Sequence, residues 1–362
     1  MKKILSIIIV FISLTFSLLF VFLPKETFSS DENRYLEKWP SLSFDNLFDG
    51  EYTGNLGSYI ADHFPYRKSF LEIKTRTEKS LGVTKQSDVY YGSDNALYQE
   101  YPKPMNSDYI INRVNDFTSN LDMDIDFMLV PTSIYIYNDR ISKYNTSYDE
   151  GITIDYYKNN LNINFIDVRD MLYENRDKEL YYKTDHHWTT LGAYYAYLVY
   201  CDELGIVPRE YEFEIVNREF YGTLYSKIID NSLSYDTIWK IKDDSNYNVY
   251  YEDDNRETDS LYNDDYLEEK DKYSYFLNGN QSLVLIDNED INDGNNILII
   301  KDSYANCFIP FLVNHYDKVH VIDPRYYGEN ISEYIDKNDI NRVLFLYNVM
   351  TIDDDGGIIG LE

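Results

Sequence analysis

The stretch ILIIKDSYAN, residues 297–306, contains the most apolar strand that the sequence predicts, and a serine follows it closely. A short, fully apolar run of this kind is typical of a strand buried on both faces. A helix is expected from about Tyr304 to Val313. Ser303 therefore falls at the carboxyl end of a strand, where ligands and catalytic groups collect in open α/β sheets, and helix N–H groups would stabilise an oxyanion beside it. The alternative is that Asp302 and Ser303 only cap the helix.

Strands and helices alternate over most of the chain. Strands are expected at 89–91, 125–130, 163–168, 297–300, 319–322 and 343–347, and helices at 109–121, 156–161, 190–204, 304–313 and 331–335. Residues 56–81 also show an amphipathic helical pattern. This alternation predicts the α/β fold class, with a mostly parallel sheet between two layers of helices, a three-layer α/β/α arrangement.

Residues 211–290 interrupt the alternation. Tyrosine, valine and isoleucine alternate with polar residues there, and acidic clusters occur at 252–254 and 264–269. We expect a β-rich insertion, so that the main domain consists of 51–210 and 291–362. The acidic clusters are expected to be solvated, since no Asp-x-Asp-x-Asp-Gly calcium loop is present.

The N-terminus predicts a membrane segment. Residues 4–23 carry no charge, and a helix of 20 residues spans about 30 Å, the thickness of the hydrocarbon core. We expect residues 1–24 to be a signal anchor and residues 25–50 a stalk. The positive-inside rule places Lys2 and Lys3 in the cytoplasm and the rest outside the cell. A cleaved signal peptide, giving a secreted protein, is the alternative, although no clear Ala-x-Ala site follows.

Composition excludes several classes of protein. The chain of 362 residues has 33 Lys and Arg against 63 Asp and Glu, a formal net charge of −30, which argues against a nucleic-acid partner and against a basic patch for anionic lipid. Two cysteines exclude a disulfide framework. No phosphate-binding or dinucleotide-binding glycine motif is present, and we expect no cofactor. The 39 tyrosines suit sugar surfaces, although an AT-rich genome gives the same bias.

The segment from Asp185 to Trp188, Asp-His-His-Trp, brings a carboxylate and imidazoles together before a helix. Asp185 and His187 can both point into one cleft, as a nucleophile's base and its orienting carboxylate must. Two other interpretations stay open: Asp185, His186 and His187 are metal ligands, or the segment has a core or capping role.

Three segments carry a resemblance to a known family. They are Asp-His-Phe-Pro-Tyr-Arg at 62–67, Asp-His-His-Trp-Thr with Gly-Ala-Tyr at 185–194, and Lys-Asp-Ser-Tyr-Ala-Asn at 301–306. They resemble the DHHW family of bacterial exported proteins and the alginate O-acetyltransferase AlgJ/AlgX group. Both are SGNH-hydrolase-like, in a permuted order in which Asp-x-His precedes the serine. The resemblance implies an SGNH-hydrolase-like fold over nearly all of the chain after the anchor.

The resemblance also implies roles for residues. Ser303 is the nucleophile, His187 the base and Asp185 the orienting carboxylate, and no metal is expected. The usual glycine before the serine is missing, since Lys301 and Asp302 stand there. The candidates for supporting, oxyanion or substrate contacts are His186, Trp188, Asp302 and Tyr304 within the motifs, and Arg325 and Asn348 by their position after strands.

The function expected is an extracytoplasmic O-acyltransferase, in particular an O-acetyltransferase, or an acetylesterase that acts on a cell-surface polysaccharide or exopolysaccharide. The resemblance implies a polytopic membrane O-acyltransferase as the acyl donor. One alternative is a non-enzymatic protein that binds or assembles polysaccharide. A second is a metal-dependent phosphoesterase that uses Asp185, His186 and His187 as ligands.

Overall fold

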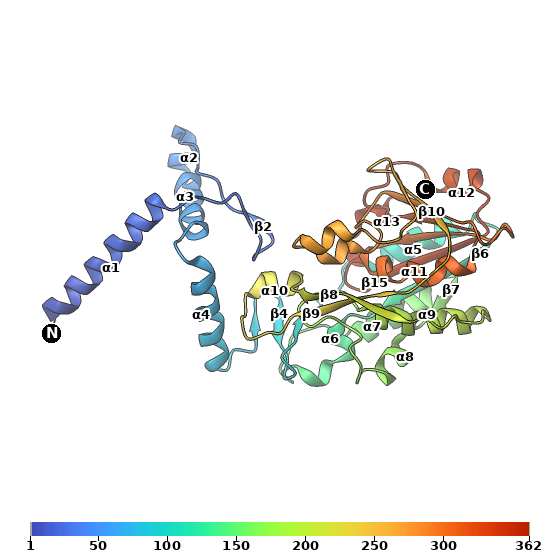
Figure 1. Ribbon diagram of the computed structural model, residues 1–362, viewed down its shortest axis with the longest axis horizontal. Coiled ribbons are helices and arrows are strands. Elements are labelled where there is room, and N and C mark those ends of the chain that lie inside the picture. The colour runs from blue at the N-terminus through green and yellow to red at the C-terminus, as the bar shows by residue number, and fades with distance from the viewer. Residues whose placement is uncertain (1, 362) are drawn as a thin grey trace. The chain divides into compact units, whose positions relative to one another are not determined.

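The computed structural model describes residues 2–361, which fall into two compact units (Figure 1). The N-terminal unit comprises Met1–Gln86 and Tyr225–Ser234, and the sheet unit comprises Ser87–Leu224 and Tyr235–Glu362. Met1 and Glu362, the outer ends of the expected anchor and of the last expected segment, lie outside the described residues.

The N-terminal unit begins with α1 (Lys2–Phe22), whose length and composition are sufficient to cross a membrane. The residues expected to form a stalk contain three short elements: β1 (Phe28–Ser29), β2 (Arg34–Tyr35) and α2 (Phe44–Phe48). The amphipathic pattern that follows forms two helices, α3 (Glu51–Asp62) and α4 (Arg67–Ser80), before the short strand β3 (Lys85–Gln86). The chain turns between the two helices because Pro65 disfavours the helical conformation of the residue before it and Tyr66 has a left-handed backbone, with φ of 61°.

The sheet unit contains one eight-stranded sheet in the order β11-β10-β12-β14-β13-β15-β6-β7. Its strands are β6 (Asp124–Val130), β7 (Asn164–Ile166), β10 (Tyr247–Tyr251), β11 (Arg256–Thr258), β12 (Leu283–Asn288), β13 (Asn296–Lys301), β14 (Lys318–Ile322) and β15 (Arg342–Asn348). Strands β14, β13, β15, β6 and β7 are parallel, whereas β12, β10 and β11 extend the edge in antiparallel pairs. The predicted α/β class with a mostly parallel sheet is confirmed.

The apolar strand at 297–300 forms the centre of this sheet. Ile299 of β13 pairs with Val321 of β14 on one side and Leu344 of β15 on the other, and all three side chains are fully buried. A strand between two parallel neighbours, with helices on both faces, has no polar face, which explains the unbroken apolar run.

The remaining elements of the sheet unit are short or medium-length helices and two small β-pairs. The helices are α5 (Ser107–Thr118), α6 (Ser133–Ile136), η1 (Asn138–Arg140), α7 (Glu150–Asn160), α8 (Arg169–Glu174), α9 (Thr190–Leu204), η2 (Asp264–Glu268), η3 (Lys272–Tyr275), α12 (Ile331–Lys337), η6 (Ile352–Asp354) and α13 (Gly356–Ile359). They gather in two groups, since α5 contacts α7 and α13 while α9 contacts α8 and α11 (Ile309–Leu312). Strands β4 (Val89–Tyr91) and β5 (Leu97–Gln99) pair antiparallel.

The segment 211–290 takes part in three different structures. Strands β8 (Phe213–Phe220) and β9 (Asp236–Ile241) form their own antiparallel pair. Helix α10 (Thr223–Ile228) leads into residues 225–234 of the N-terminal unit. Strands β10, β11 and β12 join the main sheet, so a large part of this segment is continuous with the central core.

The prediction of one continuous helix from Tyr304 to Val313 is wrong. The structure has three short pieces instead: η4 (Ser303–Cys307), α11 (Ile309–Leu312) and η5 (Val313–His315). Pro310 has no backbone N–H for the turn before it, and a tight 3₁₀ turn begins directly at Ser303. The serine therefore lies on a sharp turn and not at the start of a long helix.

Shortening Ile299 to alanine should destabilise the sheet unit by about 2–5 kcal/mol, because the removed atoms leave a cavity in the middle of the sheet. Urea unfolding followed by circular dichroism measures the change in the free energy of unfolding. Val207→Ala is the matched control, since Val207 is 83% exposed, and should change this free energy by less than about 0.5 kcal/mol. Equal effects of the two substitutions would contradict the central place of β13.

Candidate active site

The Asp-His-His-Trp segment lies in a tight loop that its own backbone closes. Tyr181 and Trp188 form an isolated antiparallel bridge, and the N–H of Thr189 donates to the carbonyl of Leu180 over 2.8 Å. The hydroxyl of Thr189 then caps α9 by accepting from the N–H of Gly192, as a threonine before a helix does. The loop thus has a fixed base, and its tip carries Asp185 and His187.

Trp188 ties this loop to the serine turn. Its side chain is fully buried, and its indole Nε1–H donates to the carbonyl of Tyr304 over 2.8 Å. The hydroxyl of Tyr304, which is also buried, donates to the carbonyl of His186. Two hydrogen bonds therefore connect the segments on either side of the 211–290 region.

Asp302 fixes the turn that presents Ser303. One carboxylate oxygen accepts from the N–H of Tyr304 over 2.8 Å, and the other accepts from the backbone N–H and the side-chain Nδ2 of Asn348, over 2.8 and 2.6 Å. Burial raises the pKa of the Asp302 carboxyl to about 6, although these hydrogen bonds oppose the rise. Asp302 and Tyr304 are buried, whereas Ser303 between them is only half-buried.

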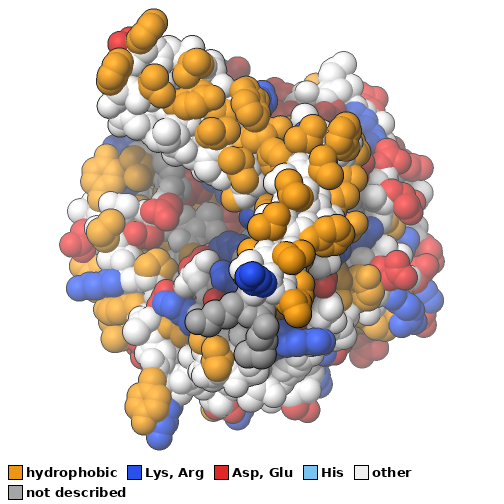
Figure 2. All heavy atoms as spheres, turned by 90° about the vertical axis from the view of Figure 1, so that its left-hand side faces the viewer, with side chains coloured by type: hydrophobic (Ala, Val, Ile, Leu, Met, Phe, Trp, Pro, Cys, Tyr) orange, Lys and Arg blue, Asp and Glu red, His pale blue; other side chains and the backbone are white. Residues whose placement is uncertain are grey.

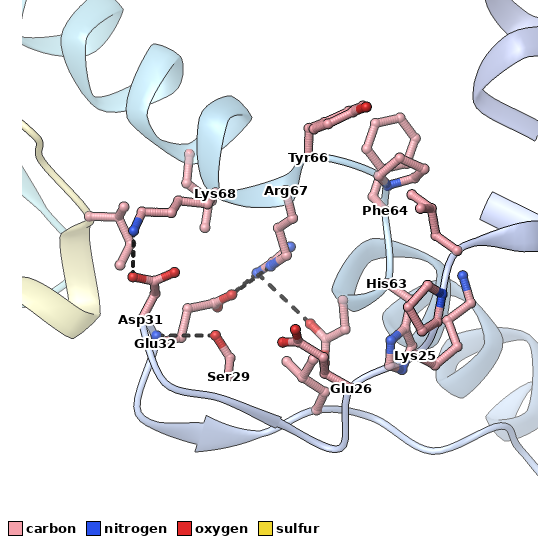
Figure 3. A pocket seen from close by; sticks show the side chains of 17 residues that line it. Lys25, Glu26, Ser29, Asp31, Glu32, His63, Phe64, Tyr66, Arg67 and Lys68 are labelled. Carbon is pink, nitrogen blue, oxygen red and sulfur yellow. Dashed lines mark hydrogen bonds and ion pairs between the residues drawn. The ribbon is translucent and has the colours of Figure 1, made fainter. Parts of the chain in front are cut away.

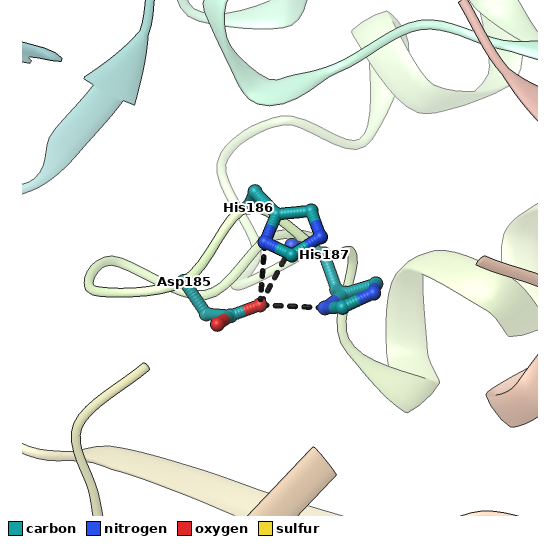
Figure 4. Close-up of side chains that lie close together, drawn as sticks. All are labelled: Asp185, His186 and His187. Atoms are coloured by element: carbon teal, nitrogen blue, oxygen red, sulfur yellow. Dashed lines mark hydrogen bonds and ion pairs between the residues drawn. The ribbon is translucent and has the colours of Figure 1, made fainter. Parts of the chain in front are cut away.

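The loop and the turn bring three predicted residues into one hydrogen-bonded chain. Oγ of Ser303 lies 2.8 Å from Nε2 of His187, and Nδ1 of His187 lies 2.6 Å from Oδ1 of Asp185. Figure 4 shows the Asp185 carboxylate directed at His187, with His186 beside it. A serine, an imidazole and a carboxylate in this order can transfer the serine proton to the ring and hold the tautomer that accepts it.

Asp185 is anchored on both of its oxygens. Oδ1 also accepts from the N–H of His187 over 3.0 Å, and Oδ2 accepts from the N–H and hydroxyl of Thr223 over 2.8 and 3.1 Å. Burial alone would raise the pKa of this carboxyl, but the two histidine rings and these hydrogen bonds hold it well below its usual range. Asp185 is therefore an ionised carboxylate that is almost inaccessible to solvent.

Two features of this site had no signal in the sequence. The ring of Tyr273 stacks on the ring of His187, with centroids 3.7 Å apart and planes within 9°, and its hydroxyl donates to the carbonyl of Ser303 over 3.1 Å. Gly222 passes so close to Asp185 that a Cβ on it would lie 2.2 Å from Oδ2. Both residues come from the irregular 211–290 segment, where no spacing or motif distinguishes them.

His186 takes a different position from its neighbour. Its Nδ1 lies 2.7 Å from the hydroxyl of Thr223 and 3.6 Å from Oδ1 of Asp185, and its side chain is about one-third exposed. It therefore lies beside the carboxylate, outside the chain that leads to Ser303.

The residues of the metal interpretation offer ligand atoms, but these atoms are not arranged to bind one ion. Asp185, His186 and His187 offer atoms within 4.8 Å of one another. The carboxylate oxygen and Nδ1 of His187 are, however, at hydrogen-bond distance, 2.6 Å. Two ligands of one tetrahedral zinc ion at about 2.0–2.2 Å stand more than about 3 Å apart. These residues as they lie are arranged for a shared proton, not for a shared ion.

Within the described residues, the side chains of Arg325 and Asn348 bind partners other than Ser303. The Arg325 guanidinium binds both oxygens of Asp323, over 2.8 and 2.6 Å. The Nδ2 group of Asn348 donates to Asp302 and to Thr351. Asn348 therefore supports the serine turn through Asp302.

Lys301, which stands two residues before Ser303, is buried beside the turn. Its Nζ lies 2.8 Å from Oδ1 of Asn306, 3.2 Å from Oδ1 of Asn280 and 3.4 Å from Oδ2 of Asp323. Burial lowers the pKa of its ammonium group. The lysine connects the end of β13 to the segment around Asn280.

Comparison with known proteins identifies the family of this chain. Residues 85–322 match the family described as DHHW protein. The chain belongs to the DHHW family. Among solved structures, a DHHW family protein from Eubacterium siraeum is 25% identical, with a TM-score of 0.68 over 76% of this chain and 97% of that one. None of the curated proteins compared with this chain matches it.

Two further structures resemble this DHHW chain at lower identity. PatB1 of Bacillus cereus, solved with a sulfonyl adduct, is 19% identical, with a TM-score of 0.64 over 76% of this chain and 98% of that one. The O-acetyltransferase domain of Pseudomonas putida AlgJ is 14% identical, with a TM-score of 0.46 over 74% of this chain and 93% of that one. The first of these shows that the fold is shared.

Gly222→Ala should displace Asp185, because the new Cβ would overlap the carboxylate. The proton between Asp185 and His187 gives a strongly downfield ¹H NMR signal when the hydrogen bond is short. We expect this signal to move upfield or disappear in the variant. Gly328→Ala is the matched control, since a Cβ there meets nothing within 4 Å. An unchanged signal in Gly222→Ala would show that the loop tolerates a side chain at this position.

Proposed function

We propose that this DHHW protein is a serine-dependent O-acyltransferase or esterase that acts outside the cytoplasm on a polysaccharide. The observation that carries the proposal is the unbroken hydrogen-bonded chain from the half-buried Ser303 through His187 to Asp185. Membership of the DHHW family and a shared fold with PatB1 are consistent with it.

In the proposed reaction, Nε2 of His187 takes the proton of Ser303 while Oγ attacks the carbonyl carbon of an acyl ester. The tetrahedral intermediate collapses when His187 returns the proton to the leaving oxygen, and the acyl group remains as a serine ester. A sugar hydroxyl then gives its proton to His187 and attacks this ester. Ser303 regains its proton as the product leaves, and water as the acceptor gives hydrolysis by the same steps.

The ring of Tyr273 assists the proposed reaction because it stacks on His187. His187 becomes a cation when it accepts the serine proton, and a cation against the face of an aromatic ring is attracted by the ring quadrupole. The stacked tyrosine ring therefore favours the charged intermediate and keeps the imidazole in the plane that reaches both neighbours. Asp185 stabilises the same cation from the opposite nitrogen.

The acyl donor and the location belong to the proposal as well. We propose that α1 is an uncleaved signal anchor and that the sheet unit faces the outside, where neither acetyl-CoA nor ATP is available. A polytopic membrane O-acyltransferase would then supply the acyl group, acetyl above all, and a cell-surface polysaccharide or exopolysaccharide would accept it. The apolar character of α1 supports the location.

Ser303→Ala should lower turnover of an acetyl-ester reporter by at least about 10³-fold, because the nucleophile is lost. The same variant should not react with phenylmethanesulfonyl fluoride, which forms a sulfonyl ester with an activated serine and releases fluoride. Intact-protein mass spectrometry detects that adduct. Labelling of Ser303→Ala equal to that of the unmodified protein would place the nucleophile elsewhere.

His187→Ala should lose activity to a similar extent, whereas His186→Ala should change it by less than about 10-fold, because only His187 reaches Ser303. Turnover of the same reporter by both variants measures this difference. A chelator should leave the unmodified enzyme active. Inactivity of His186→Ala with active His187→Ala, or loss of activity with chelator, would favour the metal interpretation.

Tyr273→Leu should lower kcat about 2- to 30-fold, the equivalent of about 0.5–2 kcal/mol for a cation–π contact, with little change in KM. Tyr273→Phe keeps the stacked ring and should recover most of this loss. Steady-state kinetics of the two variants on the reporter give the comparison. Equal losses in both variants would assign the effect to the hydroxyl and its contact with the Ser303 carbonyl.

A further inference from the structure

The helices of the N-terminal unit expose apolar side chains on one face each. Phe44, Leu47 and Phe48 follow the i, i+3, i+4 spacing of a single face of α2, and Phe44 and Phe48 are more than four-fifths exposed. Phe70 and Ile73 share a face of α4 in the same way and are also exposed. Figure 2, which looks onto this side of the molecule, shows hydrophobic side chains gathered there.

The turn between α3 and α4 packs against α1. The ring of Phe64, in this turn, stacks on the ring of Phe16 with centroids 5.3 Å apart, and Phe70 lies 5.9 Å from the same ring. Tyr59 of α3 contacts Phe20 over 6.1 Å. Phe16 precedes the end of α1 at Phe22 by six residues, which is about 9 Å along a helix. The turn is therefore held beside the last two turns of α1.

An ion-pair cluster gives this turn a fixed shape. Arg34 binds both oxygens of Asp62, and Arg67 binds both oxygens of Glu32, over 2.5–3.0 Å. A further contact of 2.9 Å joins Arg34 to Glu32, so the four charges form one neutral group. The hydrogen bonds from Arg34 lower the pKa of Asp62 to about 2. Figure 3 shows Glu32 and Arg67 paired in the wall of the pocket beneath the turn.

Residues 25–86 differ from the rest of the chain in their net charge. Residues 25–86 contain nine Lys or Arg and ten Asp or Glu, whereas residues 87–362 contain 22 and 53. An anionic lipid surface repels the second segment, but it does not repel a segment that is close to neutral. The apolar faces thus lie in the part of the chain that can approach such a surface.

We propose that α2, the turn at residues 63–66 and the apolar face of α4 form a lipid-docking surface that rests in the outer interface of the membrane that α1 crosses. The proposal rests on the location proposed above for α1. Phe64 and Phe70 contact Phe16, which lies about 9 Å before the end of α1, and this distance matches the 5–10 Å by which interfacial helices are buried. The occupant is lipid, because the turn and α4 contact the membrane helix itself through Phe64 and Phe70.

Site-directed spin labelling of the full chain in vesicles of phosphatidylethanolamine and phosphatidylglycerol tests this surface. Nitroxides are placed on Phe48→Cys and Phe70→Cys, with Tyr144→Cys as the control, since Tyr144 is 82% exposed in the sheet unit. The native thiols Cys201 and Cys307 are buried and should not be labelled. We expect labels at 48 and 70 to collide more with oxygen and less with a water-soluble nickel complex than the label at 144.

A label on Ile12→Cys, within α1, separates failure of the surface from failure of the location. If position 12 lies in lipid while 48 and 70 are as accessible to nickel as 144, the docking surface is wrong and the location stands. If positions 48 and 70 are shielded from both oxygen and nickel, protein covers them and lipid is not the occupant. If position 12 is itself accessible to nickel, the proposed location fails and the docking proposal fails with it.

Discussion

The buried carboxylate of Asp185 is the constraint on which the site depends. An ionised group that loses its hydration costs several kcal/mol unless hydrogen bonds replace the water. Asp185 obtains four such bonds: two from His187, within its own loop, and two from Thr223, far along the chain. The loop, the turn at Gly222 and Thr223, and the orientation of the imidazole are therefore mutually dependent. The close approach of the Gly222 backbone shows how little space this arrangement leaves.

Local patterns predicted the parts of the site that lie next to each other in sequence. The apolar run at 297–300 identified the central strand, and the serine after it was placed correctly at the strand's carboxyl end. The Asp-x-His spacing singled out His187 and not His186. His187 is the ring that reaches Ser303. In each of these cases a few neighbouring residues contain the whole signal, because a buried strand and a polar loop each have their own composition.

Tertiary packing determined what local patterns missed. Nothing in the sequence around Tyr273 marks it as the ring that covers His187, because the contact forms only when η3 reaches the loop. The helix after Ser303 is broken into 3₁₀ and short α pieces, since Pro310 and the buried cap of Asp302 outweigh helical periodicity. Strands β10, β11 and β12 join the main sheet through antiparallel pairing, which helix–strand alternation does not predict.

The distance between base and nucleophile along the chain also has a consequence for folding. His187 and Ser303 are 116 residues apart, and β13, which leads to the serine, pairs with β14 and β15, both of which follow it. A chain that emerges N-terminus first therefore presents the histidine loop long before its partner. The contact between His187 and Ser303 can form only after Ser303 has been made, and β13 gains both of its neighbours only when β15 follows. The site is therefore completed late in synthesis, and a chain that stops before residue 303 has no serine for His187 to bind.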